Sequence, residues 1–483
     1  FADIDRFSSA SLITRMTNDV NAMTMMLNMG LRMLVRAPVM LIAALGISIS
    51  INPRLAVVLL VVIPLMILAI GILMKICTKL FEVMQTKIDG LNNTLQENLV
   101  AIRVVKAFVR EDHERKKFQR SNDELMMAGL NVGMKVIAIM PIMMLAMNGA
   151  TVAVLYLGGK MVMAEGFLLG DLQAFINYIF QILMSVMMVA MALLQLTRAQ
   201  ACAHRINEVL SAEPSVENKP QAQRPAQDEL PAPRGRVEFR DVSFHYPSSD
   251  KNVLEHITFQ AKRGETVAFI GATGSGKTTL VSLAARFYDA TEGTVLVDGV
   301  DVRDYTFDAL YDRIGYVTQK AILFSGDVRG NVLFGASRGK DSDADVQKAL
   351  ELAQASEFVD RMPGGIHAPI AEGGTNVSGG QKQRLSIARA LARRPEILVF
   401  DDSFSALDYR TDTRLRAGLD RELKDTTRLI VAQRIGTIRN ADKIIVLDEG
   451  RMVGMGTHEE LMQTCPIYQE IARSQLSQEE LGA

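Results

Sequence analysis

One short run of the sequence has the residue types and spacing that bind phosphate groups. Gly271–Thr278 reads Gly-Ala-Thr-Gly-Ser-Gly-Lys-Thr. Glycines let backbone N–H groups approach phosphate oxygens, the lysine reaches the terminal phosphates, and the threonine hydroxyl coordinates Mg²⁺. A chance glycine-rich turn is the alternative, but a β-rich run precedes this segment and a helical pattern follows it, as phosphate binding requires. We therefore predict a nucleoside-triphosphate site.

A carboxylate that would complete this site follows a second apolar run. Residues 397–400 read Ile-Leu-Val-Phe, and Asp401 comes directly after them. Many strands end in an aspartate, so this pattern alone is weak. Beside a phosphate loop, however, a buried strand that ends in a carboxylate is the expected second half of a site for the triphosphate and Mg²⁺.

Short β-rich runs position these residues and alternate with helical stretches. The β-rich runs are 237–239, 266–270, 294–297, 397–400, 429–431 and 443–447. The helical stretches include 277–287, 346–353 and 380–392. Alternation of this kind predicts an α/β domain with a largely parallel sheet.

The composition of the 483-residue chain differs between its two halves. The whole chain is 48% hydrophobic with a formal net charge of −1, which argues against a nucleic-acid-binding protein held by a basic field. Its three cysteines are too few for a disulfide framework or a metal cluster. Residues 1–210 carry 19 Lys/Arg and 14 Asp/Glu, a net of +5, and the remainder a net of −6. This division predicts more than one domain.

The N-terminal half contains apolar stretches long enough to cross a membrane, which takes roughly 20 residues. We predict four spans, at about residues 34–51, 55–74, 136–159 and 172–197. The connector 75–135 carries 11 Lys/Arg, whereas the connector 160–171 carries one. The positive-inside rule therefore places the long connector in the cytoplasm. Four spans return the chain to the side where it began, so we also expect residues 1–30 and everything after Arg198 in the cytoplasm. The alternative is that these runs are buried helices of a large soluble core. So many long apolar runs rarely occur together in a soluble domain, which argues against it.

A proline-rich stretch separates the two halves. Residues 211–236 contain five of the 14 prolines of the chain, and their composition predicts an extended tether that buries little apolar surface. The predicted domains are a transmembrane domain at 1–210, a linker at 211–236 and a nucleotide-binding domain at 237–483.

The segment before Asp401 carries a resemblance to a known family. Val377–Arg384 reads Val-Ser-Gly-Gly-Gln-Lys-Gln-Arg and closely resembles the signature of ATP-binding-cassette (ABC) proteins. Tyr246 resembles the aromatic residue that stacks on adenine, Gln319 the glutamine loop, and Asp408 the loop that crosses the dimer interface. The match covers essentially the whole C-terminal half in the expected order.

This resemblance implies ATP and Mg²⁺ as cofactors and a defined set of site residues. The implied ATP-binding residues are Tyr246, Gly271, Thr273, Gly274, Ser275, Gly276, Lys277, Thr278, Thr279 and Gln319. The implied Mg²⁺ ligands are Thr278, Gln319 and Asp401. The signature residues Ser378, Gly379, Gly380 and Gln381 are implied to contact ATP bound by a partner cassette.

The N-terminal half resembles the membrane domain of an exporter-type ABC half-transporter. Residues 11–22 resemble its first intracellular coupling loop and residues 97–109 its second. Members normally carry six membrane helices per half and four are predicted here, so we expect the first two to be missing from this sequence. The resemblance implies an all-α transmembrane domain followed by an α/β P-loop cassette.

Two positions depart from the family pattern. The family has Glu directly after the strand-end aspartate to polarise the attacking water, but this chain has Asp402. One methylene less moves a carboxylate by roughly 1.5 Å, and a misplacement of about 1 Å lowers a rate roughly a hundredfold. The switch histidine is replaced by Gln433, which donates hydrogen bonds but cannot carry the imidazolium charge.

Together these changes resemble the degenerate half of a heterodimeric ABC exporter. We expect this chain's own site to bind ATP and hydrolyse it poorly, and its signature to complete a competent site whose Glu and His come from a second half-transporter. The 27 methionines suit adaptable packing, or alternatively a plastic pocket for varied hydrophobic ligands.

The predicted function is therefore ATP-driven export of a hydrophobic small molecule, lipid or peptide across a prokaryotic plasma membrane. No nucleic acid partner is expected. The alternatives are an ATP-gated regulatory or channel-like ABC protein and a homodimeric lipid or peptide exporter.

Overall fold

The chain folds as two compact units. The computed structural model describes residues 1–163, 167–219, 234–247, 249, 251–335 and 342–475. A helical unit comprises Ser9–Ala212, and a C-terminal unit comprises Glu213–Ala483 together with Phe1–Ser8. Residues 1–8, which the sequence predicts to belong to the transmembrane domain, thus group with the C-terminal unit. Residues 220–233 of the predicted linker lie outside the described residues.

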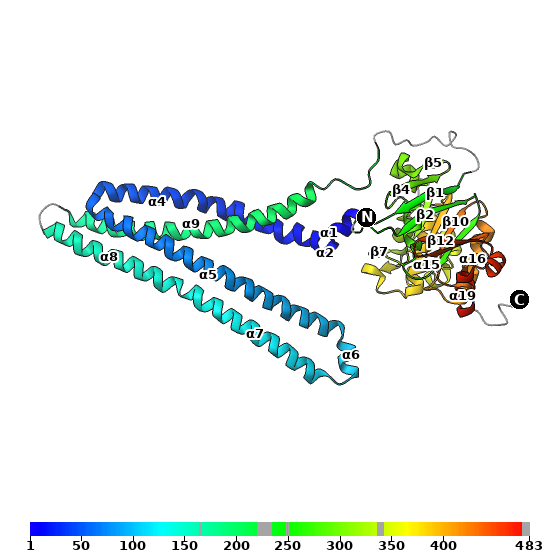
Figure 1. Cartoon of the computed structure of the whole chain (residues 1–483), viewed down its shortest axis with the longest axis horizontal. Helices are drawn as coiled ribbons and strands as arrows, with labels where there is room; N and C mark the ends of the chain where they lie inside the picture. Colours follow the sequence, from blue (N-terminus) through cyan, green and yellow to red (C-terminus); the bar gives the residue numbers. More distant parts are fainter. Residues whose placement is uncertain (164–166, 220–233, 248, 250, 336–341, 476–483) are drawn as a thin grey trace. The chain divides into compact units, whose positions relative to one another are not determined.

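Long helices build the helical unit (Figure 1). The first segment comprises α2 Ser9–Thr14, the π-helical turn η1 Arg15–Asp19, α3 Val20–Met25, the π-helical turn η2 Met26–Gly30 and α4 Leu31–Ile51. The others comprise α5 Pro53–Val100, α6 Ile102–Ala107, α7 Glu111–Ile137, α8 Ile139–Met163 and α9 Leu169–Leu210. Four segments of the described chain are long and apolar enough to cross a membrane. Each of the four predicted spans lies within one of them.

The sharp turn between the first two spans has a local cause. Asn52 Oδ1 accepts hydrogen bonds from the backbone N–H groups of Arg54 and Leu55 at 3.0 and 3.2 Å. Pro53 occupies the first position of α5, where a missing N–H costs nothing and its fixed φ suits a helix. The chain therefore ends α4 and starts α5 within two residues.

The helices pack through a narrow core and leave much apolar surface outside. α4 packs along α9, and α5 packs along α7 and α8 (Figure 1). Leu59 and Ile179 are fully buried in this core, whereas Val61 and Leu68 are 64% and 61% exposed. Apolar side chains on the outside of long helices are expected where lipid is the solvent.

Two main sheets form the centre of the C-terminal unit. The antiparallel sheet has the order β2-β1-β4-β5 and the six-stranded sheet the order β12-β11-β3-β10-β9-β6, in which only β12 is antiparallel; β7 pairs with β8. The strands are β1 Val237–Phe244, β2 Leu254–Ala261, β3 Thr266–Gly271, β4 Glu292–Val297, β5 Val300–Asp301, β6 Ile314–Val317, β7 Gly326–Asp327, β8 Pro369–Ile370, β9 Ile397–Asp401, β10 Thr427–Val431, β11 Lys443–Asp448 and β12 Arg451–Gly456.

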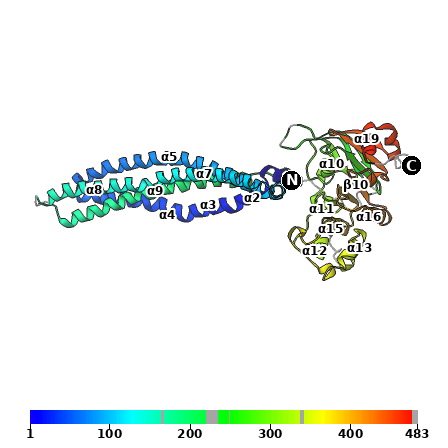
Figure 2. The same ribbon diagram turned by 90° about the horizontal axis from the view of Figure 1, so that it is seen from below.

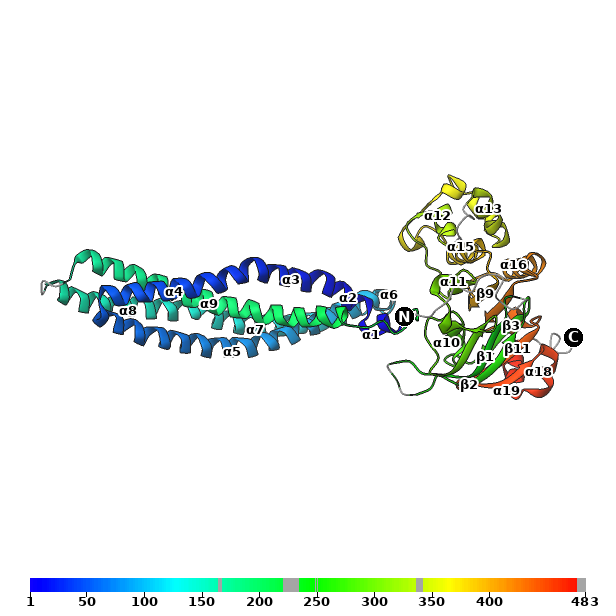
Figure 3. The same cartoon turned by 90° about the horizontal axis from the view of Figure 1, so that it is seen from above.

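Helices cover these sheets, and a group of them lies to one side (Figures 2 and 3). That group contains α12, α13 and α15. The helices of this unit are α1 Ala2–Phe7, α10 Lys277–Ala284, α11 Phe307–Tyr311, α12 Val328–Leu333, α13 Asp343–Leu352, α14 Ser356–Val359, α15 Gly379–Ala392, α16 Tyr409–Glu422, α17 Ile435–Ile438, α18 His458–Thr464 and α19 Pro466–Gln475, with 3₁₀ turns η3 Val302–Asp304, η4 Gly365–His367 and η5 Glu372–Gly374.

The strand order brings the predicted site residues to one edge. β10 pairs in parallel with β3 on one side and β9 on the other, with Leu429 opposite both Val267 and Val399. The carboxyl ends of parallel strands meet at the same edge, where ligands of open α/β sheets bind. The loop after β3 and the carboxylate at the end of β9 therefore lie one strand apart.

The prediction of a largely parallel sheet is correct for the six-stranded sheet only. Two of the six predicted strands, β1 and β4, belong to the separate antiparallel sheet. The predicted helix 277–287 ends at Ala284, because Arg286 adopts a left-handed φ of 51°.

Candidate nucleotide site

The loop between β3 and α10 depends on its glycines. Gly271 and Gly276 have φ values of 156° and 94°. A Cβ atom on Gly271 would lie 2.0 Å from the Leu447 carbonyl oxygen, and one on Gly276 would lie 2.9 Å from that of Val253. Both positions thus require glycine, because a side chain would collide with neighbouring backbone. The loop they form lies at the N-terminus of α10, and the first N–H groups of a helix can bind an anion.

Lys277 folds back over this loop. Its Nζ donates to the carbonyl oxygens of Gly271 and Ala272 at 2.9 and 2.6 Å and to Ser275 Oγ at 3.3 Å. The lysine is 8% exposed, and burial lowers the pKa of its ammonium group, against the opposing effect of the Asp401 and Asp402 carboxylates. When a nucleotide binds, this ammonium group could donate its hydrogen bonds to phosphate oxygens in place of the carbonyl oxygens, and hydrogen bonds between charged groups are the stronger ones.

Thr278 and Asp401 meet as the paired motifs predict. Thr278 Oγ1 donates to Asp401 Oδ1 at 2.8 Å, and the Tyr316 hydroxyl donates to Asp401 Oδ2 at 3.3 Å. Asp401 is 4% exposed, and burial raises the pKa of its carboxyl group although both hydroxyl donors lower it. Tyr316 was not predicted; its place in β6, three residues before Gln319, is the signal that would have found it.

These side chains suit Mg²⁺. The Thr278 hydroxyl and the Asp401 carboxylate are in contact, and together with the predicted ligand Gln319 they would supply oxygen atoms, the ligands that Mg²⁺ prefers, with water and phosphate as the remaining ligands. Bound there, Mg²⁺ would neutralise charge on the β- and γ-phosphates. The described residues contain no cluster of three or more His, Cys, Asp or Glu that could hold a metal ion.

The two divergent positions contact each other. The Asp402 carboxylate oxygen Oδ2 accepts hydrogen bonds from Gln433 Nε2 at 2.7 Å and from Gln319 Nε2 at 3.2 Å. Asp402 is 6% exposed and has a left-handed φ of 48°. Burial raises the pKa of this carboxyl group, whereas the two amide donors lower it. The structure thus brings the predicted residues Asp402, Gln433 and Gln319 together around one oxygen atom.

Tyr246 lies next to the phosphate-loop helix. Its hydroxyl is 2.9 Å from Thr279 Oγ1, and its ring makes edge contacts with Phe244 and Tyr288 at centroid distances of 5.0 and 5.3 Å. Stacking of the Tyr246 ring on an adenine base stays a prediction. Thr273 and Gly274, in the exposed turn of the loop, remain predicted ligands.

The signature residues begin helix α15. Ser378 is its N-cap, and Ser378 and Gln381 form a capping box in which Ser378 N donates to Gln381 Oε1 at 2.8 Å and Gln381 N donates to Ser378 Oγ at 3.3 Å. Ser378 and Gly379 are exposed. Among the hydrogen bonds of the described residues, none joins Ser378 or Gln381 to the phosphate loop. An exposed helix N-terminus is available to an anion.

A buried glutamine that the sequence analysis missed connects α15 to the glutamine loop. Gln383 is 2% exposed, and its Nε2 donates to the Thr318 carbonyl oxygen at 3.3 Å. It lies within the signature run, but only the fold shows that its side chain points inward. Asp408, by contrast, is exposed and caps α16 through a hydrogen bond from Thr411 N at 3.0 Å, which holds the pKa of its carboxyl group low.

Comparison with known proteins agrees with both units. The family described as the ABC transporter transmembrane region matches residues 2–186, and the ABC transporter family matches residues 254–405. An uncharacterized ABC transporter ATP-binding protein of Mycobacterium tuberculosis is 42% identical over 97% of this chain and 80% of its own length. The ATP-dependent lipid A-core flippase of Desulfotalea psychrophila is 33% identical over 95% of this chain and 79% of its own length.

A solved structure of a bacterial Atm1-family ABC exporter with ATP bound matches with a TM-score of 0.78 and 26% identity, over 99% of this chain and 82% of the other. The phosphate loop, the strand-end aspartate and the signature helix occur here on the fold that these relatives imply. The chain therefore belongs to the ABC transporter family, as an exporter-type half-transporter in which a multi-pass transmembrane domain is fused to an ATP-binding cassette that drives export.

Proposed function

We propose that this chain is the poorly hydrolysing half of a heterodimeric ABC exporter. The observation that carries the proposal is the contact between Asp402 and Gln433. A general base must reach the attacking water through a short hydrogen bond, but the Asp402 carboxylate is one methylene shorter than glutamate and is already bonded by two amides. Neither amide can carry the positive charge that a histidine supplies.

Binding of ATP at the same site has the groups it needs. Lys277, Thr278 and Asp401 lie together around the phosphate loop, which supports their proposed role as ligands of the triphosphate and Mg²⁺. The exposed Ser378 and Gly379 at the start of α15 are available to ATP held by another cassette. The proposed partner is thus a second half-transporter that supplies the missing Glu and His.

The test is ATP turnover by the full chain purified alone in lipid nanodiscs. We expect bound ATP to remain largely uncleaved in single-turnover measurements, with Lys277→Ala as the control that should bind ATP more weakly. Addition of the partner half-transporter should raise the rate, and Ser378→Ala should reduce that increase. Fast hydrolysis by the unmodified chain alone would refute the proposal.

The helical unit supports a hydrophobic or amphipathic substrate. A cavity of about 400 Å³ lies between α4, α5 and α9, and its lining is apolar except for Thr197. Apolar pockets of this size suit lipid-like ligands or drug-sized molecules. ATP-dependent movement of a fluorescent lipid in vesicles that contain both half-transporters would support this class; no movement of any lipid, drug or peptide would exclude it.

A homodimeric lipid exporter is the second candidate. Its lipid substrate is favoured by relatives such as the ATP-dependent lipid A-core flippase of Desulfotalea psychrophila, which shares 33% identity along 95% of this chain. The two proposals differ in one measurement, because a homodimer must hydrolyse ATP and move lipid with no other half-transporter present.

A further inference from the structure

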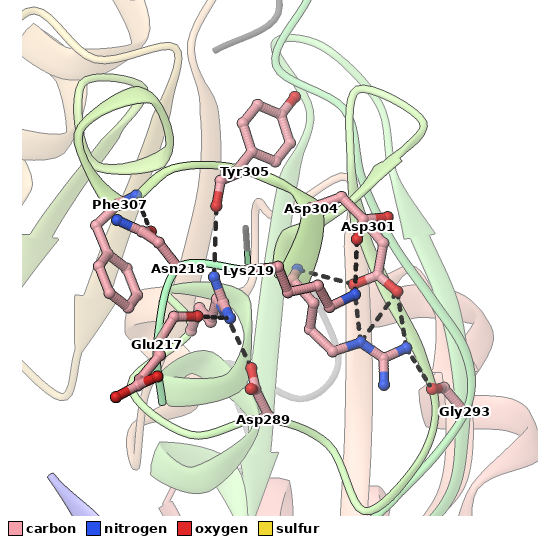
Figure 4. Close-up of polar contacts among 11 residues, drawn as sticks. Glu217, Asn218, Lys219, Asp289, Gly293, Asp301, Asp304, Tyr305 and Phe307 are labelled. Carbon is pink, nitrogen blue, oxygen red and sulfur yellow. Dashed lines mark hydrogen bonds and ion pairs between the residues drawn. The ribbon is translucent and has the colours of Figure 1, made fainter. Parts of the chain in front are cut away.

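Three residues in the first half of the predicted linker 211–236 are bound to the cassette (Figure 4). Glu217, Asn218 and Lys219, which we call the strap, each contact a different group of the C-terminal unit. Composition predicted a tether here, yet this part of it makes specific hydrogen bonds. The strap therefore has a docking surface, and its residues identify which parts of the cassette it engages.

Arg286 is the centre of that surface. It is 2% exposed, and its Nη2 donates to the Glu217 carbonyl oxygen at 2.8 Å. The same guanidinium donates to Asp289 Oδ1 at 3.0 Å and to the Tyr305 carbonyl oxygen at 3.4 Å. A buried charged group needs partners for its donors, so departure of the strap would deprive Nη2 of this acceptor.

Asn218 accepts a hydrogen bond from a backbone N–H at the start of α11. Its Oδ1 accepts a hydrogen bond from the backbone N–H of Phe307 at 2.9 Å. Phe307 is the first residue of α11, and the first N–H groups of a helix have no partner within it. Lys219 Nζ forms a 2.7 Å ion pair with Asp304 in which both side chains are about half exposed, so this contact contributes least.

Arg286 also belongs to the end of the phosphate-loop helix. Arg286 N donates to the Leu283 carbonyl oxygen at 3.0 Å and Phe287 N to that of Ser282 at 2.9 Å, which fixes the arginine to the last turn of α10. The first turn of the same eight-residue helix carries Lys277 and Thr278. The hydrogen bonds of Arg286 N and Phe287 N continue the bonded segment past Ala284, so a nucleotide that restrains Lys277 and Thr278 would also restrain the arginine that holds Glu217.

We propose that docking of the strap and binding of nucleotide at the phosphate loop are thermodynamically coupled through Arg286. Nucleotide strengthens strap docking, and by reciprocity strap docking strengthens nucleotide binding. Arg286 and Asn218 are positioning residues in this scheme, because neither touches the phosphate-binding groups. The inference rests on ATP binding by the cassette and is independent of how fast ATP is cleaved.

The test compares variants of the full chain in nanodiscs, with Mg·ATP as the probe. Arg286→Ala would leave Asp289 without its buried partner and could fail to fold, so Asn218→Ala is the decisive variant. Asn218→Asp keeps an acceptor for Phe307 N, and Glu217→Gln alters a side chain whose backbone alone is used; these are the matched controls.

We expect Asn218→Ala to raise the Kd for Mg·ATP by about fivefold, the lower end of typical couplings, while both controls stay within about twofold. In the unmodified chain, Mg·ATP should slow hydrogen exchange of the Phe307 amide by a similar factor. An unchanged Kd in Asn218→Ala, or an exchange rate of Phe307 that ATP does not alter, would overturn the coupling.

Discussion

Gln433 Nε2 donates a 2.7 Å hydrogen bond to Asp402 Oδ2. Gln433 follows the end of β10 and Asp402 follows the end of β9, and the family resemblance predicts a different residue type at both positions. Because they contact each other, their effects on turnover should not be additive. The pair is therefore best studied as one unit.

Restoring both family residues should raise the hydrolysis rate of this site. Asp402→Glu with Gln433→His should increase kcat roughly a hundredfold, the scale of a 1 Å correction in a catalytic group. Each single change should yield less than half of that gain on a logarithmic scale. Steady-state ATPase measurements on the full chain, with Lys277→Ala added as the blank, check this. No gain in a double variant that still binds ATP would show that other groups limit hydrolysis.

Loss of Lys277 should weaken nucleotide binding without unfolding the cassette. Lys277→Ala removes three hydrogen bonds that are internal to the loop and the charge that faces the phosphates. Loss of a charged hydrogen bond costs about 2 kcal/mol, which predicts an increase in the Kd for Mg·ATP of more than about tenfold. Fluorescent ATP titration measures it, and Lys320→Ala, an exposed lysine, is the control. Equal Kd values for the two variants would contradict the assignment.

The raised pKa of Asp401 predicts a specific pH dependence. Burial favours the protonated carboxyl group in the folded protein, so this residue's contribution to stability is present at low pH and is lost as pH rises through the folded pKa. In the nucleotide-free chain, the apparent Tm of the unmodified protein should therefore rise relative to Asp401→Asn on acidification from pH 7.5 toward the ordinary aspartate value of 3.8.

Mg·ATP should show the opposite trend, because Mg²⁺ requires the carboxylate. Its affinity for the unmodified chain should fall over the same acidification. Thermal unfolding and ATP titration at several pH values test both statements, and a Tm difference that does not change with pH would contradict the first.

The helical unit contains one ion pair whose removal should be costly. Arg205 donates to both carboxylate oxygens of Asp19, at 2.8 and 2.6 Å, and Asp19 is 3% exposed. Arg205→Ala would leave a buried carboxylate without this charged donor, and because the arginine side chain is itself 49% exposed, we expect a cost of about 2 kcal/mol, the range for a hydrogen bond to a charged group. Lys87→Ala, which breaks the exposed pair with Glu124, should cost less than about 1 kcal/mol. Apparent Tm values of the two variants in one detergent make the comparison; equal values would contradict it.

The sequence predicted best what local patterns encode. The loop Gly271–Thr278 and the strand-end Asp401 are each recognised from the residue spacing within one short segment. The membrane spans are recognised from uninterrupted apolar runs. The antiparallel sheet was not predicted, because strand partners are set by contacts between distant segments. The bonding of Asp402 by both Gln319 and Gln433 likewise depends on which strand ends meet.

The strap shows why some contacts escape prediction altogether. Its strongest anchor on Arg286 is the carbonyl oxygen of Glu217, an acceptor that every residue type carries. The arginine itself follows a helix in a left-handed conformation that glycine favours, so its type gave no warning of the turn. Neither Glu217 nor Arg286 therefore gives a signal for this contact in the composition or the periodicity of the sequence.

The position of the strap also determines which linker residues set the length of chain between α9 and the first contact with the cassette. α9 ends at Leu210, and Glu217 is bound to the cassette seven residues later. Residues 220–233 follow the bound strap in the chain, so insertions among them leave the number of residues between Leu210 and Glu217 unchanged. While the strap is docked, insertions in 220–233 should leave transport unaffected, whereas insertions in 211–214 should uncouple the two units.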